Sequence, residues 1–210
     1  MKNKDFDIYE FLKSRPLSYS AFNSFSDETW GDPEKWFKTY ILGERQSSPE
    51  LTFGSYVDKK IQNDPKFLPT LPRYEEMQYK MKAVLGKAIP IVGIPDGVNL
   101  RKSKKLADFK TGKIPWNQKK ADETRQLTWY IMLLYINLKI QPDEFDCFIH
   151  WLPTVKTEDG NFDVKIEFVP DIDNKIQTFK TKRSMTDVLN LINEITVTLG
   201  KMQEYVRNHE

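Results

Sequence analysis

Hydrophobic residues in the first third of the chain recur at the three- and four-residue spacing of helices that bury one face. Residues that begin or end helices separate these stretches. Pro16 follows the first, Asp32-Pro33 precedes the third, Thr52 begins the fourth, and Asp64-Pro65 ends it. The pattern therefore predicts a set of short helices at about residues 6–12, 19–25, 33–42 and 53–63.

The period changes to two in the middle of the chain, as expected for half-buried strands. Turn-forming residues at 95–97 and 101–104 separate the apolar segments. After the last of these strands the helical spacing returns, and we expect one long helix over residues 119–138. The predicted strands cover residues 79–85, 89–94 and 106–110, and a further strand lies between the turn at 95–97 and a hairpin turn at 101–104 that leads into the strand at 106–110.

The last third predicts two strands and a helix. Apolar residues favour strands at 145–155 and 162–169, with a turn at 158–160 between them. Ser184 and Asp187 have the spacing of a capping box, which predicts a final helix to about residue 206. Helices, strands, a long helix, strands and a helix in this order indicate an α/β fold, with a central mixed β-sheet flanked by helices.

We therefore predict a single domain over residues 1–210 with three parts. An N-terminal helical part covers residues 1–70, a central part covers 71–138, and closing strands with a C-terminal helix cover 139–210. A chain of 210 residues with 39% hydrophobic and 13% aromatic residues can build one packed core.

Composition excludes several classes of protein. The 32 basic and 30 acidic residues give a net charge of +2, which argues against a strongly basic nucleic-acid coat and against an acidic tail protein. The single cysteine, Cys147, cannot form an intramolecular disulfide or a cysteine-held iron–sulfur cluster. The longest apolar run, 129–136, is too short to span a membrane, and no secretory signal is visible. We expect a cytoplasmic protein without a membrane partner.

Asp108 and Lys110 are the first candidates for chemistry. The Asp-x-Lys tripeptide recurs elsewhere in the chain and is uninformative alone. Here it lies on a predicted strand, so both side chains leave the same face, whereas Ala107 and Phe109 leave the other. The bland alternative is a salt bridge on an exposed edge strand, but the apolar neighbours argue against such an edge.

Asp96 is the second carboxylate, at the end of an apolar strand between Gly93 and Gly97. If the strands at 89–94 and 106–110 pair, Asp96 and Asp108 converge on one site. Two carboxylates with open water positions suit Mg²⁺ or Mn²⁺. A nearby lysine can bind a phosphate or stabilise developing charge, so this site is suited to phosphodiester hydrolysis. A turn aspartate beside glycine is the alternative for Asp96.

Gln126 and Tyr130 add a second element, because residues four apart share one face of a helix. Both have polar tips on an otherwise apolar segment. Gln126 can reach Lys110, a metal-bound water or a phosphate, with Tyr130 supporting it. Tyr130 is equally well explained as a core tyrosine with a satisfied hydroxyl.

Together, Pro95-Asp96, Asp108-Phe109-Lys110-Thr111-Gly112 and the segment Gln126 to Tyr130 resemble the PD-(D/E)XK nuclease superfamily. The resemblance is to the RecB-like group, which includes phage and CRISPR-associated exonucleases, and spans about residues 17–135. It implies a restriction-endonuclease-like core. Several relatives carry four cysteines for an iron–sulfur cluster, and this chain lacks them.

The resemblance also implies roles. Asp96 and Asp108 would bind the metal with the main-chain carbonyl of Phe109, and Lys110 would be the catalytic lysine. Gln126 and Tyr130 would organise the site. Asp58 stands where the group usually has a metal-binding histidine, and a solvated helix charge is its alternative reading.

Three residues near this site are candidates for contact with DNA. Trp116 can stack on an unpaired base, and Lys113 and Arg125 can bind the backbone. Core packing for the tryptophan and a solvated surface for the cations are the alternatives.

The expected function is that of a metal-dependent DNA nuclease, and the resemblance implies that it leaves 5′-phosphate and 3′-hydroxyl ends. We favour an exonuclease on single-stranded or frayed DNA ends. The alternatives are a non-catalytic DNA-binding module of the same fold, and an endonuclease or resolvase of the same superfamily. A protein partner from recombination or repair is compatible with this interpretation.

Overall fold

The computed structural model describes residues 6–26, 31–44, 48–64, 71–86, 88–112, 114–153 and 176–209. Residues 65–70, the main part of a stretch at 64–72 whose three prolines predict a loop, lie outside these residues, as do the turn at 158–160, the strand at 162–169 and Lys113. The helices are α1 (Ile8–Ser14), α2 (Tyr19–Ser26), α3 (Pro33–Trp36), α4 (Pro49–Asn63), α5 (Gln118–Glu123), α6 (Arg125–Leu138) and α7 (Met185–His209). The strands are β1 (Leu17–Ser18), β2 (Glu76–Met77), β3 (Met81–Leu85), β4 (Ile89–Gly93), β5 (Gly97–Asn99), β6 (Lys105–Gly112), β7 (Asp146–Pro153) and β8 (Gln177–Thr181).

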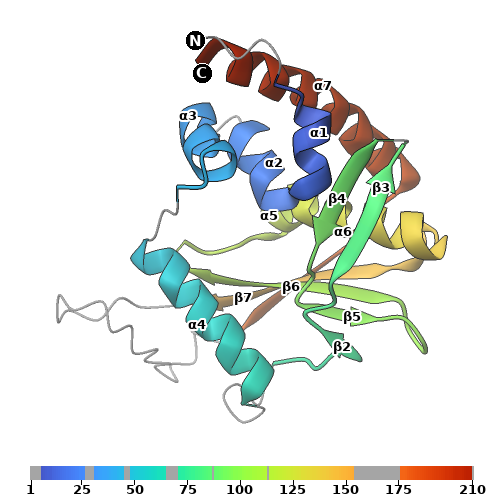
Figure 1. Ribbon diagram of the computed structural model, residues 1–210. Coiled ribbons are helices and arrows are strands. Elements are labelled where there is room, and N and C mark those ends of the chain that lie inside the picture. Colours follow the sequence, from blue (N-terminus) through green and yellow to red (C-terminus); the bar gives the residue numbers. More distant parts are fainter. Residues whose placement is uncertain are drawn as a thin grey trace.

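The described strands form two mixed sheets. One has the order β1-β4-β3, with β1 and β4 parallel, and the other has the order β2-β5-β6-β7-β8, with β6 and β7 parallel. Helices lie on both sides of the five-stranded sheet, with α4 on one side and α6 on the other (Figure 1). The predicted mixed α/β fold is confirmed, although two sheets stand where one was expected.

The helices of the N-terminal part begin at side-chain caps. Asp7 accepts a hydrogen bond from the N–H of Tyr9 at 2.8 Å, and Asp32 accepts one from the N–H of Lys35 at 2.9 Å. Helix α3 continues as a π-helical turn, Phe37–Ile41. Helix α4 ends at Asn63 as predicted but begins three residues before Thr52, because Ser48 caps it and Pro49 occupies its first position.

The predicted single helix at 119–138 is wrong in one respect, since the structure divides it into α5 and α6. The backbone of Thr124 is extended, with φ −65° and ψ 119°. Arg183, which follows β8, donates from Nη2 to the carbonyl oxygens of Ala121 at 2.9 Å and Thr124 at 3.1 Å. A side chain sixty residues away thus satisfies the carbonyls that the break exposes.

Two hydrophobic clusters cover the two faces of the five-stranded sheet. The larger contains Leu106, Cys147 and Ile149 from the sheet, together with α6 and α7. The smaller packs Ala107 and Phe109 against α4. Successive residues of β6 and β7 thus point to opposite faces.

Helix α6 is the centre of the larger cluster. All residues from Leu127 to Leu134 are buried. Trp129 is fully buried, stacks on Phe22 with 5.6 Å between the ring centres, and donates from Nε1 to the carbonyl of Val92 at 3.0 Å.

No helix in the described part of the chain has the length and hydropathy to cross a membrane.

Candidate metal-dependent active site

Asp96 lies in the link between the two sheets. The expected pairing of the strands at 89–94 and 106–110 is wrong, because β4 pairs with β1 and β3, whereas β5 pairs with β6. The chain leaves one sheet after Gly93 and enters the other at Gly97. Asp96 still reaches β6, where its Oδ2 accepts a hydrogen bond from the N–H of Phe109 at 2.6 Å.

Asp108 and Lys110 leave the same face of β6, as their spacing predicts. Asp108 is 2% exposed, and its Oδ2 lies 2.7 Å from Nζ of Lys110. Apart from this ion pair with Lys110, Oδ2 has no hydrogen-bond partner among the described residues. A buried carboxylate oxygen in this condition has coordination capacity to spare.

Helix α6 brings Gln126 and Tyr130 onto this pair. Lys110 Nζ donates to Gln126 Oε1 at 2.5 Å, while Gln126 Nε2 donates to Asp108 Oδ1 at 3.0 Å and to the Tyr130 hydroxyl at 2.8 Å. One amide thus contacts a cation, an anion and a phenol. Five of the sequence-predicted residues, Asp96, Asp108, Lys110, Gln126 and Tyr130, therefore lie together.

Burial and repulsion between carboxylates raise the pKa values of two aspartates at the site, Asp96 and Asp58. Burial raises the pKa of Asp96 well above its usual value, and repulsion from Asp108 raises it further, against the hydrogen bond from Phe109. Burial also raises the pKa of Asp58 on α4, with a further contribution from Asp108. A cation between these carboxylates would relieve the repulsion.

Lys110 and Tyr130 keep their protons. Burial opposes the charge on Lys110, but attraction to Asp108 outweighs it and raises the pKa of the ammonium. Burial raises the pKa of Tyr130, and the nearby Asp108 adds to this effect. The site therefore holds a protonated amine and a protonated phenol beside its carboxylates.

The donors present fit a hard divalent cation. Asp96 and Asp108 supply carboxylate oxygens, and among the described residues the Lys110 ammonium is the contact of Asp108 Oδ2. Among the residues that the structure describes, no three Asp, Glu, His or Cys side chains group closely enough to hold a metal. A cation here would therefore rely on carbonyl or water ligands in addition to two carboxylates.

The three candidates for DNA contact differ in their surroundings. Arg125 forms an ion pair with Glu194 and donates to Asn23 Oδ1 at 3.0 Å, so its guanidinium is already engaged. Trp116 is partly buried against the larger cluster, and Nζ of Lys120 lies 4.5 Å from its ring centre. Lys113 lies outside the described residues.

Two contacts beside the carboxylates were missed from the sequence. Gln78, between β2 and β3, donates from Nε2 to Asp96 Oδ1 at 2.5 Å. The ring of Tyr74 packs directly over Gly97, and its hydroxyl lies 2.7 Å from His150 Nε2. Neither residue belongs to a periodic pattern or a motif, because each acts through a tertiary contact.

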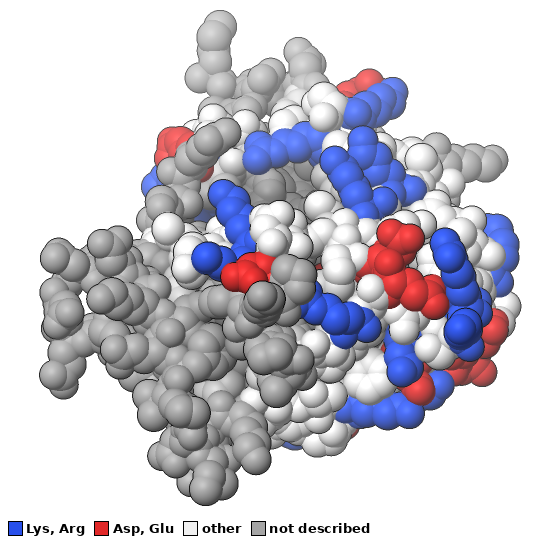
Figure 2. Space-filling view, turned by 90° about the horizontal axis from the view of Figure 1, so that it is seen from below, with Lys and Arg blue, Asp and Glu red and all other residues white. Residues whose placement is uncertain are grey.

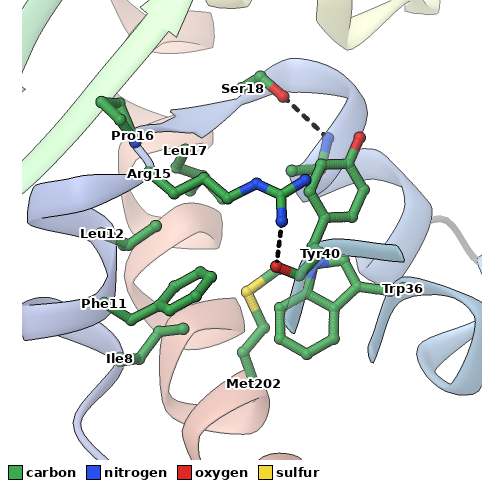
Figure 3. Close-up of a pocket in the computed structure, with 11 residues that line it drawn as sticks. Ile8, Phe11, Leu12, Arg15, Pro16, Leu17, Ser18, Trp36, Tyr40 and Met202 are labelled. Carbon is green, nitrogen blue, oxygen red and sulfur yellow. Dashed lines mark hydrogen bonds between the residues drawn. The ribbon is translucent and has the colours of Figure 1, made fainter. Parts of the chain in front are cut away.

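A separate cavity of roughly 90 Å³ lies among α1, α2, α3 and α7 (Figure 3). Its lining is largely apolar and includes Leu12, Trp36 and Met202. Arg15 extends beside Tyr40 and donates to the carbonyl of Tyr40 at 2.5 Å. None of the carboxylates of the candidate active site lines this cavity.

The surface charge is mixed. On the face shown in Figure 2, Lys and Arg side chains form several separate groups, with Asp and Glu side chains between them. This distribution agrees with the net charge of +2. Among the described residues of this face, a charged substrate would therefore meet separate basic groups.

The structure thus has a mixed α/β fold in which two buried carboxylates, Asp96 and Asp108, and the ammonium of Lys110 meet at strand β6. Comparison with protein-family models and with curated proteins gives no match. Solved structures do match. The "Putative exonuclease" of Eubacterium rectale has a TM-score of 0.60 and 13% identity, over 100% of this chain and 87% of its own.

Two further structures carry related names. The alkaline exonuclease of Laribacter hongkongensis has a TM-score of 0.55 and 10% identity, over 94% of this chain and 93% of its own. A phage-related exonuclease of Haemophilus somnus 129PT has a TM-score of 0.50 and 16% identity, over 84% and 79% of the two chains. At these identities the likeness shows a shared fold.

Proposed function

We propose that this protein is a metal-dependent DNA nuclease of the RecB-like PD-(D/E)XK type. The observation that carries the proposal is the convergence of Asp96, Asp108 and Lys110 on one site, joined by the amide of Gln126. The fold shared with proteins named as exonucleases supports it. We favour an exonuclease acting on single-stranded or frayed DNA ends, in the cytoplasm.

Asp96 and Asp108 would hold Mg²⁺ or Mn²⁺ with the carbonyl of Phe109, and Asp58 would add charge from α4. When bound, the cation would lower the pKa of a coordinated water and neutralise charge on the phosphate. Asp58 is close enough for its charge to act on Asp108 and Lys110. The carboxylates would thus set the position at which the scissile phosphate is held.

Lys110 would act on the phosphate directly. Its ammonium stays protonated, and it is held by Gln126 Oε1 and Asp108 Oδ2. A fixed positive charge at this position stabilises the negative charge that develops during hydrolysis, or orients the attacking water. Gln126 would hold the Lys110 ammonium and the Asp108 carboxylate in position through its hydrogen bonds to both, and Tyr130 would hold Gln126.

The protein around the site would bind the nucleic acid. Trp116 would stack on an unpaired base, and Lys113 would contact the backbone. Arg125 would contribute less than a free arginine, because Glu194 shares its charge. A protein partner from recombination or repair would supply the DNA ends.

The test is a cleavage assay on end-labelled single-stranded, linear duplex and circular DNA with Mg²⁺ or Mn²⁺. Asp108→Asn should lower the rate at least a thousandfold, since it removes one of two metal-binding carboxylates. Asp122→Asn is the matched control, because Asp122 is exposed on α5 and accepts a hydrogen bond from Gln118. A chelator should abolish cleavage by the wild type.

The substrate preference separates the alternatives. Cleavage of linear but not circular DNA supports the exonuclease, and cleavage of circular DNA supports the endonuclease or resolvase. DNA binding without cleavage of any substrate, by a folded protein, would replace the proposal with a non-catalytic binding module.

A further inference from the structure

Gln78 makes two hydrogen bonds to one residue of the candidate site. Its side-chain Nε2 donates to Asp96 Oδ1 at 2.5 Å, and its backbone N–H donates to the carbonyl of Asp96 at 3.0 Å. The next residue, Tyr79, donates its N–H to the carbonyl of Pro95 at 3.2 Å. The segment between β2 and β3 is thus fastened to the link that carries Asp96.

The backbone of Gln78 is unusual. Its φ is +52°, in the left-handed region that non-glycine residues seldom occupy. Among the described non-glycine residues, only Lys139 also has a positive φ, and that residue is the C-cap of α6, where this conformation is common. No helix end explains Gln78, and such conformations persist only where surrounding contacts hold them.

Each carboxylate oxygen of Asp96 accepts a hydrogen bond from a different segment of the chain. Gln78 holds Oδ1, and the N–H of Phe109 holds Oδ2 at 2.6 Å. Asp96 is 8% exposed and is repelled by Asp108 and Asp58. Without two neutral donors, this carboxylate would be free to rotate away from the neighbouring negative charges.

We propose that Gln78 is a positioning residue that fixes the Asp96 carboxylate for a divalent cation. This inference rests on the proposed metal-dependent function. Gln78 touches neither the reacting atoms nor the metal, and acts through Asp96, as hydrogen-bonding partners of metal ligands commonly do. Being uncharged, its amide orients the carboxylate without neutralising the charge that attracts the cation.

The experiment compares Gln78→Gly and Gln78→Ala with the wild type. Glycine accepts the positive φ and keeps the backbone N–H that bonds Asp96, so this variant removes the amide alone. The matched control is Gln118→Ala, because Gln118 Nε2 donates to Asp122 Oδ1 at 2.8 Å on exposed α5. Mn²⁺ binding is measured by calorimetry on metal-free protein, and thermal unfolding is measured without metal.

We expect the dissociation constant for Mn²⁺ to rise about tenfold or more in both Gln78 variants. Gln118→Ala should bind Mn²⁺ like the wild type, and metal-free Gln78→Gly should unfold near the wild-type temperature. Unchanged Mn²⁺ affinity in Gln78→Gly would overturn the inference. Loss of affinity only in proportion to loss of folded protein, in both variants, would also overturn it and leave Gln78 a structural tie.

Failure of the proposed function has a different pattern. If the wild type and Asp108→Asn bind Mn²⁺ equally weakly, there is no metal site to position, and both proposals fall. If the wild type binds Mn²⁺ through Asp108 and Gln78→Gly binds equally well, only the role of Gln78 is lost.

Discussion

The two faces of the five-stranded sheet both bury titratable side chains, but the neighbouring residues are charged on the face toward α6 (the charged face) and aromatic on the face toward α4 (the aromatic face). On the face toward α6, Asp108 is 2% exposed and has a lysine, a glutamine and a second carboxylate near it. On the face toward α4, His150 of β7 is 1% exposed, and Phe109 and Phe148 flank its ring at 5.4 and 6.0 Å. Asp108 and His150 are thus buried to nearly the same extent, but only Asp108 has charged side chains beside it among the described residues.

The imidazole of His150 has neutral hydrogen-bonding partners. Nε2 lies 2.7 Å from the hydroxyl of Tyr74, and Nδ1 lies 2.9 Å from Oγ1 of Thr178. No carboxylate of the described residues contributes to its titration, and burial lowers the pKa of His150 to about 4. A buried titratable residue with neutral neighbours, such as His150, is therefore best explained by a structural role. Buried titratable residues that lie beside other charged groups, as at Asp108, are typical of a candidate active site.

The strongest way to break this comparison is to remove the cation from the charged face. Lys110→Met keeps most of the apolar stem and removes the ammonium beside Asp108. We expect the cleavage rate to fall about a thousandfold, or roughly 4 kcal/mol of transition-state stabilisation. Single-turnover cleavage of end-labelled DNA measures this loss.

Lys119→Met is the matched control, because Lys119 is an exposed lysine on α5 whose ion pair with Glu123 is long, at 3.8 Å. It should cleave at nearly the wild-type rate. Wild-type cleavage by a folded Lys110→Met protein would show that the charged face is no more catalytic than the aromatic one.

Burial of His150 on the aromatic face predicts that the free energy of unfolding falls at acidic pH. The unfolded chain protonates His150 near pH 6.5, whereas the native protein resists protonation down to about pH 4. Stability should therefore fall as the pH drops from 6.5 to 4, by up to about 3 kcal/mol. Urea unfolding at pH 7, 5.5 and 4.5 gives the slope.

The comparison is made with His150→Phe. This variant leaves the Tyr74 hydroxyl without its hydrogen-bonding partner on His150, so it should be less stable at every pH, but it should lose less stability on acidification. Parallel curves for the two proteins would mean that another group causes the acid sensitivity.

Two glycines extend the comparison at a smaller scale, because Gly93 of β4 allows close packing of α6 and Gly97 of β5 allows close packing of Tyr74. A Cβ at Gly93 would lie 2.6 Å from Leu133 Cδ1 and 3.0 Å from the Tyr130 ring, and a Cβ at Gly97 would overlap the Tyr74 ring. Gly93→Ala and Gly97→Ala should each destabilise the protein by about 1–3 kcal/mol, as overpacking does. Urea unfolding measures both.

Gly200 provides the control within α7, where an added Cβ would meet nothing within 4 Å. Gly200→Ala should stabilise the helix by up to about 1 kcal/mol. Equal effects at all three positions would show that the close approaches at Gly93 and Gly97 carry no energetic weight.

Local rules made much of the fold predictable from the sequence. Pro16 and Asp64 lie just beyond helices where they were expected, and Ser184 and Asp187 form both bonds of the predicted capping box. The contacts between Asp108 and Lys110, and between Gln126 and Tyr130, follow from the periods of a strand and a helix.

Features set by distant contacts were not predictable. The antiparallel pairing of β5 with β6 agrees with the predicted hairpin turn at 101–104, but the placement of β4 and β6 in different sheets depends on where the chain changes sheets, and the break at Thr124 depends on Arg183. The strands β1 and β2 have two residues each, too few to show a period, and β8 was missed. Gln78 has no sequence signal, because its role is a contact across eighteen residues.

The reactivity of Cys147 can serve as a probe for opening of the five-stranded sheet. This residue is the only cysteine of the chain, it is fully buried on β7, and burial raises the pKa of its thiol to about 12. A thiol reagent can modify it only when the sheet opens, because the reactive thiolate is both hidden and disfavoured in the native state. The rate of its modification therefore reports opening of the central strands in the unmutated protein, without an added label.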